Sequence, residues 1–212
     1  MTAQVAILGA GGHARVVADI LMSMAGKGAD LTIAGFIAPE GDAWLDIPLL
    51  GDDAALAGLV SSGAVSHFIV GVGSTCGGQP LRRRLASIAA DAGALPISAI
   101  HPAAVIGREV VILPGTAVMA LAAVNAGSRI GRHVIVNTGA CIDHDAVVGD
   151  FAHLAPRSVL SGNVRVGNNA LVGVGACVRQ GISIGSDATL GAGAVAVSDI
   201  ADGVTAKGIP AR

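Results

Sequence analysis

Residues 129–148 read RIGRHVIVNTGACIDHDAVV, and an aliphatic side chain recurs at every sixth position of this stretch. Extending the count in both directions gives sixteen consecutive Ile, Leu or Val residues in steps of six, from Ile100 to Leu190. Four residues after each of them stands Ala, Ser, Thr or Val in fifteen of the sixteen cases, Ile182 being the exception. A period of six matches neither an α-helix nor a half-buried strand with simple alternation.

This hexapeptide period predicts a left-handed parallel β-helix whose coils have three short, flat faces. Six residues form one face and 18 form one coil, with the aliphatic residue inside and the small residue at the tight corner. Residues 100–195 then make about five coils, stacked at the ~4.8 Å spacing of neighbouring strands. Prisms of this kind usually pack side by side in threes, so we expect a homotrimer.

The first 95 or so residues follow a different pattern, in which short apolar strands alternate with helices. The expected strands are residues 4–8, 31–37 and 66–70, and the expected helices are residues 13–25, 53–60 and 79–92. This alternation predicts a small parallel sheet of the doubly wound, Rossmann-like type. With the boundary near Pro96–His101, we expect an α/β domain over residues 1–96 and the β-helix over residues 97–212.

The composition excludes several classes of protein. Of the 212 residues 52% are hydrophobic and only 13% are charged. A net charge of −2 without a basic patch excludes nucleic-acid binding. The long uncharged stretches, residues 54–81 and 110–128, are interrupted by Gly and Pro and do not resemble membrane spans. Because the first residues also lack the features of a signal peptide, we expect a cytoplasmic protein without membrane contact.

A glycine-rich loop follows the first predicted strand and leads into the first helix. It reads Gly9-Ala10-Gly11-Gly12-His13-Ala14 and satisfies the pattern G-x-G-x-x-A. Its backbone can approach a phosphate at the N-terminus of the helix. Dinucleotide binding also needs an acidic residue at the end of the second strand, where Ile37-Ala38-Pro39 stands instead. The loop therefore predicts a single nucleotide or diphosphate site, the alternative being a glycine turn that only packs helix on strand.

Two neighbours of this loop are candidates for the same site. The segment Gly71-Val72-Gly73-Ser74 follows the third strand and is expected at the same edge of the sheet. His13 opens the first helix, where it either caps the helix or donates a hydrogen bond to substrate.

In the β-helix, His144 is the strongest candidate for acid–base chemistry because Asp143 and Asp145 flank it. A carboxylate next to an imidazole fixes its tautomer and raises its basicity, as a general base requires. Gly162 follows one full coil after His144, so its backbone N–H is a plausible donor to a developing oxyanion. His153, nine residues after His144, is expected to line the same cleft, either within one chain or across a subunit boundary.

The remaining histidines and cysteines are expected to be structural. His101 and His133 lack an acidic neighbour of this kind, and Cys141 and Cys177 read as small packing residues of one column. The spacing of the three cysteines, which are these two and Cys76, is typical neither of a metal site nor of a disulfide framework. Zinc needs about three protein ligands, and His133, His144 and His153 do not share a column. We therefore expect no metal site.

Taken together, these motifs resemble the hexapeptide acyltransferases. The resemblance rests on the repeats, on His144-Asp145 and on the ending Lys207-Gly208-Ile209-Pro210-Ala211-Arg212. The Gly-Ala-Gly-Gly-His loop ahead of a β-helix resembles one branch of this family. That branch contains the sialic acid O-acetyltransferase-like proteins and the N-acetyltransferases of nucleotide-linked amino sugars, including those that make diacetamidobacillosamine and N-acetylperosamine.

This resemblance implies an acetyl-CoA-dependent N-acetyltransferase that acts on the C4 amine of a nucleotide-linked 4-amino-4,6-dideoxy sugar. Acetyl-CoA would lie between two β-helices of a trimer, and the N-terminal domain would hold the sugar nucleotide. His144 would be the catalytic base, Asp145 its orienting carboxylate and Gly162 the amide that polarises the thioester carbonyl. Contacts with acetyl-CoA are expected at His153, Gly173, Gly191 and Lys207 or Arg212, and contacts with the sugar nucleotide at Gly11, Gly12, His13 and Gly73.

Several alternatives remain open at this point. The acceptor is either an amine or a hydroxyl, and the latter would make the protein an O-acetyltransferase of sialic acid or another sugar. A metal-dependent hydratase and a non-catalytic scaffold or sugar-nucleotide sensor are further possibilities on this fold. Relatives often carry acidic residues after the second strand, whereas Ala38-Pro39 with a displaced Glu40 stands here. The choice among UDP, GDP and dTDP is therefore left open.

Overall fold

The chain divides into two compact units, Met1–Pro102 and Ala103–Arg212, in the computed structural model, which describes residues 2–73 and 79–212. Ser74 and Cys76 lie outside the described residues. The division falls a few residues after the boundary expected at residue 96. No helix in the described ranges is both long enough and apolar enough to cross a membrane.

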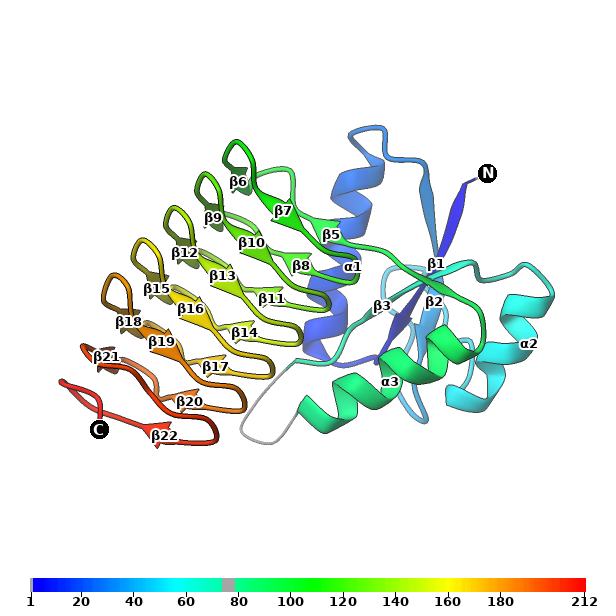
Figure 1. Cartoon of the computed structure of the whole chain (residues 1–212). Helices are drawn as coiled ribbons and strands as arrows, with labels where there is room; N and C mark the ends of the chain where they lie inside the picture. Colours follow the sequence, from blue (N-terminus) through cyan, green and yellow to red (C-terminus); the bar gives the residue numbers. More distant parts are fainter. Residues whose placement is uncertain (1, 74–78) are drawn as a thin grey trace. The chain divides into compact units, whose positions relative to one another are not determined.

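The first unit contains a parallel sheet with the strand order β2-β1-β3-β4 (Figure 1). Its strands are β1 (Ala3–Leu8), β2 (Leu31–Ile37), β3 (His67–Val70) and β4 (Leu95–Pro96), and a further short strand, β5 (Ala99–Ile100), ends the unit. Its helices are α1 (Gly12–Ala25), the 3-10 helix η1 (Asp53–Ala55), α2 (Leu56–Ser61) and α3 (Gln79–Asp91). The expected Rossmann-like sheet is confirmed, with an additional edge strand, β4, that is too short to produce a periodic signal.

Strand β1 lies between β2 and β3 and is the centre of this sheet. Its residues Val5–Leu8 have no exposed surface, as expected for a strand covered on both faces. From β1 the chain passes to β2 on one side of β1, whereas β3 pairs with β1 on its other side. The direction in which successive strands are added to the sheet therefore reverses at β1. Ligands of doubly wound sheets bind at the carboxyl ends of the strands at such a reversal.

The second unit is a parallel β-helix with three faces. Face 1 contains β6 (Val105–Ile106), β9 (Ala123–Val124), β12 (Cys141–Ile142), β15 (Val159–Leu160), β18 (Cys177–Val178) and β21 (Val195–Ala196). Face 2 contains β7 (Val111–Ile112), β10 (Arg129–Ile130), β13 (Val147–Val148), β16 (Arg165–Val166) and β19 (Ser183–Ile184). Face 3 contains β8 (Ala117–Val118), β11 (Ile135–Val136), β14 (His153–Leu154), β17 (Leu171–Val172), β20 (Thr189–Leu190) and β22 (Thr205–Ala206).

From β6 to β18, each strand pairs with the strand 18 residues further on, as Ile130 does with Val148. The predicted hexapeptide β-helix is therefore confirmed, and Figure 1 shows its coils stacked along one axis. The second residue of most strands is the aliphatic residue of the repeat, and it is buried in the interior from Val118 to Leu190. Three residues after it, the backbone adopts a left-handed conformation in every repeat from Glu109 to Gly193.

The coils continue beyond residue 195, where the six-residue count of the sequence stops. Strand β22 pairs with β20 through Leu190 and Ala206, and Ile184 pairs with Ile200. These partners are 16 residues apart instead of 18, so the last coil is two residues shorter than the others. This shorter coil comes in addition to the five counted over residues 100–195, and the six-residue count misses it because the two missing residues shift its aliphatic positions.

Candidate active site

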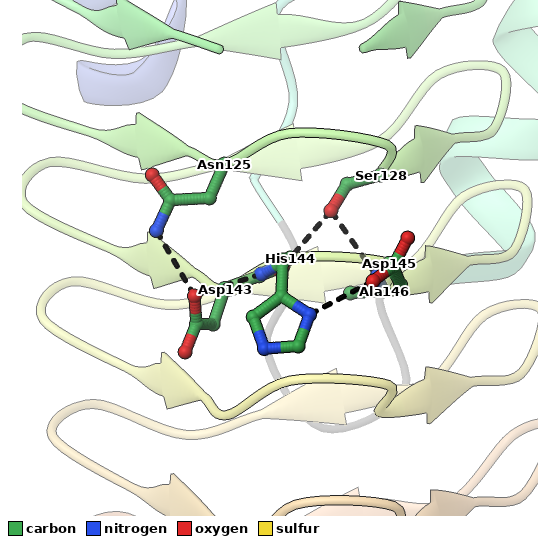
Figure 2. A network of polar contacts seen from close by, with 6 residues as sticks. All are labelled: Asn125, Ser128, Asp143, His144, Asp145 and Ala146. Atoms are coloured by element: carbon green, nitrogen blue, oxygen red, sulfur yellow. Dashed lines mark hydrogen bonds and ion pairs between the residues drawn. The ribbon is translucent and has the colours of Figure 1, made fainter. Parts of the chain in front are cut away.

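His144 lies on a turn that joins face 1 to face 2. We call the turns at this corner, residues 107–110, 125–128, 143–146, 161–164 and 179–182, the His144 edge. The imidazole Nδ1 is 2.8 Å from Asp145 Oδ2, and Figure 2 shows the two side chains turned toward each other. Asp145 can turn back in this way at a corner residue with φ of 58°, a conformation that Asp and Asn tolerate better than most residues. The structure therefore brings the predicted pair into contact.

The surroundings of His144 favour its protonated form. The hydrogen bond with Asp145 is the largest cause of a raised pKa of His144, and the charges of Asp143 and Asp145 act in the same direction. Asp143 accepts a hydrogen bond from the backbone N–H of His144 at 2.8 Å, and this bond is the largest cause of the lowered pKa of Asp143. The imidazole side chain is 49% exposed, so an acceptor substrate can reach it from solvent.

Gly162 lies directly beside the His144 ring, one coil further on. A Cβ atom at Gly162 would be only 2.5 Å from His144 Nε2, so the imidazole occupies the space that a side chain would need. The next residue, Asn163, donates its backbone N–H to the carbonyl of His144 at 2.9 Å. Among the described residues, the Gly162 N–H has no hydrogen-bond partner. A donor next to a base is thus available for a negatively charged oxygen.

The residues expected to contact acetyl-CoA gather at a different corner. We call the turns from face 3 to face 1, residues 119–122, 137–140, 155–158, 173–176 and 191–194, the glycine edge. A Cβ at Gly173 would lie 2.7 Å from the backbone of Gly191, and a Cβ at Gly191 would lie 3.0 Å from Lys207 Cγ. Gly173, Gly191 and Lys207 therefore form one column. Close stacking of the coils is itself a reason for glycine at residue 173.

His153 lies apart from His144 within one chain. It belongs to β14 on face 3 and is 7% exposed, and its Nε2 lies 3.1 Å from Asn137 Nδ2 on the glycine edge. Nine residues are half of an 18-residue coil, so His144 and His153 lie on opposite sides of the prism. The expectation that both line one cleft is not met within a single chain.

The first unit contains a cavity of about 460 Å³ at the carboxyl edge of its sheet. Its lining includes apolar residues from the ends of β1, β2 and β3 and three charged residues, Asp52, Asp53 and Arg84. Arg84 Nη2 and Asp53 Oδ2 form an ion pair of 2.8 Å, and Asp52 accepts a hydrogen bond from the backbone N–H of Ala54. The cavity combines an apolar wall with a few charged groups, a typical composition for a small-molecule site.

The predicted glycine loop borders this cavity without forming most of it. Gly9 and Val72 line the cavity, whereas Gly11, Gly12, His13 and Gly73 do not. His13 and Gly73 are nevertheless neighbours, since a Cβ at Gly73 would lie 3.6 Å from the Cβ of His13. At Gly11 and Gly12 a Cβ would meet no other atom within 4 Å, so both face open space at the start of α1.

Sequence reasoning missed two groups of residues. Asn125 and Ser128 contact the His144 turn from the coil before it. A search for polar residues 18 positions apart would have found Asn125 with Asp143, but not Ser128, which stands 18 residues before Ala146. Asp52, Asp53 and Arg84 come from outside the repeat, and no sequence signal links them to the glycine loop. No cluster of three or more metal-ligating side chains occurs within residues 2–73 and 79–212.

Comparison with known proteins identifies the family of the chain. The family model of the PglD N-terminal domain matches residues 4–87. A histidine-to-asparagine mutant of perosamine N-acetyltransferase from Caulobacter crescentus, in complex with CoA and GDP-perosamine, is 41% identical over 100% of this chain and 97% of that chain, with a TM-score of 0.91. The acetyltransferase domain of PglB from Neisseria gonorrhoeae FA1090, in complex with acetyl coenzyme A, is 37% identical over 100% and 99% of the two chains, with a TM-score of 0.89.

The sequence identity of both relatives is high enough to show membership of one family and not only a shared fold. Both matches span the α/β unit and the β-helix. The chain therefore belongs to the family of acetyl-CoA-dependent sugar N-acetyltransferases that join a PglD-type N-terminal domain to a hexapeptide-repeat β-helix.

Proposed function

We propose that this enzyme transfers the acetyl group of acetyl-CoA to the C4 amine of a nucleotide-linked 4-amino-4,6-dideoxy sugar, acting in the cytoplasm. The observation that carries the proposal is the His144–Asp145 pair, with a 2.8 Å contact, placed over the backbone of Gly162. A base beside an amide donor suits acyl transfer, because one group removes a proton while the other stabilises an oxyanion. The perosamine and PglB relatives support an amine as the acceptor.

In this mechanism the chain supplies a base and an oxyanion donor. Asp145 accepts a hydrogen bond from His144 Nδ1–H, which leaves Nε2 as the acceptor for a proton of the attacking amine. The amine nitrogen forms the new bond to the acetyl carbon, the carbon–sulfur bond breaks, and the proton held on His144 passes to the leaving sulfur. The Gly162 N–H stabilises the acetyl oxygen while it is negatively charged.

Acetyl-CoA supplies an activated acetyl thioester, and the glycine edge has groups that fit it. Lys207 and Arg212 are exposed cations held close together, since the backbone of each donates a hydrogen bond to the other at 2.9 and 3.1 Å. Such cations suit the phosphates of the co-substrate. His153 and Asn137 lie on the same side of the prism, and Gly173 and Gly191 add no side chain to the column that leads from Asn137 to Lys207.

The active site is proposed to lie between two copies of the chain in a homotrimer. The support is that His144 and the glycine edge are separated by face 1 in a single chain. We expect that His144→Ala chains co-assembled with His153→Ala chains regain activity, since one interface of a mixed trimer then has both histidines. Activity no higher than the sum of the two separate variants would indicate a site within one chain.

The pH dependence follows from the raised pKa of His144. The base must be neutral to accept a proton, so kcat/KM is expected to fall as the pH drops through this pKa. Asp145→Asn weakens the main cause of the raised pKa and retains a residue suited to the left-handed conformation. Its acid limb should therefore shift to lower pH in a kcat/KM profile. A shift to higher pH, or none, would contradict the role of Asp145.

The cavity of the first unit is proposed to hold the nucleotide. Arg84 lies on its wall, paired with Asp53, where its positive charge favours the diphosphate. We expect Arg84→Gln to raise KM for the nucleotide sugar about threefold to tenfold, the value of one exposed charge-assisted hydrogen bond, and to leave KM for acetyl-CoA unchanged. Arg83→Gln is the matched control, because Arg83 is exposed on the same helix but does not line the cavity. Equal effects of both variants would place the nucleotide elsewhere.

A thiol-release assay tests the acceptor directly. Acetyl-CoA is mixed with a panel of GDP-, UDP- and dTDP-linked 4-amino-4,6-dideoxy sugars, and the panel member with the highest kcat/KM identifies the nucleotide. We expect turnover of at least one amine that His144→Ala largely abolishes. Turnover only with sialic acid or another sugar hydroxyl would show that the enzyme is an O-acetyltransferase.

A further inference from the structure

Two side chains from the preceding coil hold the turn that carries His144. Asn125 Nδ2 donates to Asp143 Oδ1 at 3.1 Å at the start of the turn. Ser128 is buried; its hydroxyl donates to the carbonyl of Asp143 at 2.9 Å and accepts from the N–H of Ala146 at 3.1 Å. Figure 2 shows these contacts on both sides of His144. Both ends of the turn are therefore fastened to the coil before it.

Asp143 connects this support to His144 itself. The same oxygen, Asp143 Oδ1, accepts from Asn125 Nδ2 and from the backbone N–H of His144. Two donors on one carboxylate keep it ionised and in place, in line with the lowered pKa of Asp143. Figure 2 shows Asp143 on one side of His144 and Asp145 on the other, so two carboxylates flank the base.

The hexapeptide repeat itself does not require the contact between Asn125 and Asp143. The corresponding position in other coils is Gly107, Ser161 or Arg179, and those coils stack with the same register. A pair that the fold can do without, next to the base, points to a task in the reaction. The nearest cations on this edge, Arg108 and Arg179, are two coils away from His144 and Asp143 respectively, about 10 Å at the ordinary strand spacing.

We propose that Asn125 is a positioning residue for the acyl transfer, which anchors Asp143 and thereby fixes the backbone and imidazole of His144 over Gly162. The inference rests on the proposed function, since a task for Asn125 exists only if His144 handles the proton. Asn125 does not touch the substrate in this account. Its influence passes through Asp143, and this route distinguishes it from a residue that only stabilises the coil.

A double-mutant cycle tests this route. Asn125→Ala is expected to lower kcat about threefold to tenfold, the value of one exposed hydrogen bond to a charged group, with little change in either KM. In an Asp143→Ala background the same change should have almost no effect on kcat, because the link is already broken. Asp143→Asn retains an oxygen for both donors but removes the charge, so the acid limb of its kcat/KM profile should move to lower pH.

Asn168→Ala is the matched control. Asn168 Oδ1 accepts a hydrogen bond from the backbone N–H of Asp150 at 2.8 Å, so this asparagine also links two neighbouring coils, on another corner of the prism. We expect it to lower the melting temperature about as much as Asn125→Ala does, without changing kcat. Equal loss of kcat in both variants, an equal effect of Asn125→Ala with and without Asp143, or no effect at all would overturn the inference.

The His144→Ala variant distinguishes a failure of the proposed function from a failure of the role of Asn125. If His144→Ala retains wild-type turnover, the proposed function of His144 fails. If His144→Ala is inactive while Asn125→Ala is fully active, only the role of Asn125 fails.

Discussion

Replacement of His144 by alanine is expected to lower kcat for acetyl transfer about 10²–10⁴-fold, the usual contribution of a positioned general base. The imidazole is 49% exposed and its ring contacts Asp145 at the surface, so the substitution should leave the coil intact. Steady-state thiol release with saturating substrates measures the loss. Affinity for CoA, measured by calorimetry, should change little, because the predicted CoA contacts lie on the glycine edge.

The control for this prediction is Gln180→Ala. Gln180 is exposed on the same edge, two coils after His144, and makes no contact with the base. It should retain wild-type kcat and a similar melting temperature. A His144→Ala variant with kcat within about threefold of wild type, well below the usual value of a general base, would restrict His144 to a role in binding.

Gly162→Ala is expected to produce the second largest effect, a loss of kcat of about 10²-fold, comparable to that from an impaired oxyanion hole. A Cβ at residue 162 would lie 2.5 Å from His144 Nε2 and 2.6 Å from His144 Cε1, so the ring must rotate away. The half-exposed ring can turn toward solvent by giving up its hydrogen bond to Asp145, and Gly162 has no left-handed backbone that would strain an alanine. The variant should therefore fold normally while its base is displaced.

Thermal unfolding and kinetics together check this prediction. The melting temperature of Gly162→Ala should stay close to that of wild type, while kcat falls and both KM values change little. Ser161→Ala is the control, as it alters the adjacent half-buried residue of the same turn without approaching the imidazole. A fully active Gly162→Ala enzyme would contradict the arrangement of base and amide.

Much of the β-helix could be predicted from the sequence because its contacts repeat. An inward aliphatic residue every six positions fixes the length of a face, and a partner 18 residues away fixes the register, as for Ile142 and Leu160. The same arithmetic placed Gly162 beside His144. It failed at the end of the chain, where the last coil is two residues short and the pairing of Leu190 with Ala206 breaks the count.

The rest of the candidate site lay beyond this arithmetic. A separation of nine residues puts His153 on the far side of the coil from His144. The repeat in the sequence does not reveal which faces of the β-helix meet when several chains assemble. In the α/β unit, contacts depend on how non-repeating segments pack. The cavity is thus lined by Asp53 and Arg84, which are 31 residues apart. The residues predicted to bind the nucleotide do not line it; these are Gly11, Gly12, His13 and Gly73.

The most direct test of the central claim is the identity of the bond that the enzyme makes. Carbon-13-labelled acetyl-CoA is allowed to react with the GDP-, UDP- or dTDP-linked 4-amino-4,6-dideoxy sugar that is turned over best, and the product is analysed by NMR. We predict an amide, with the labelled carbonyl coupled to the proton on the C4 nitrogen of the sugar. A labelled ester on a sugar hydroxyl, or only free labelled acetate, would contradict the assignment of this chain as a nucleotide-sugar N-acetyltransferase.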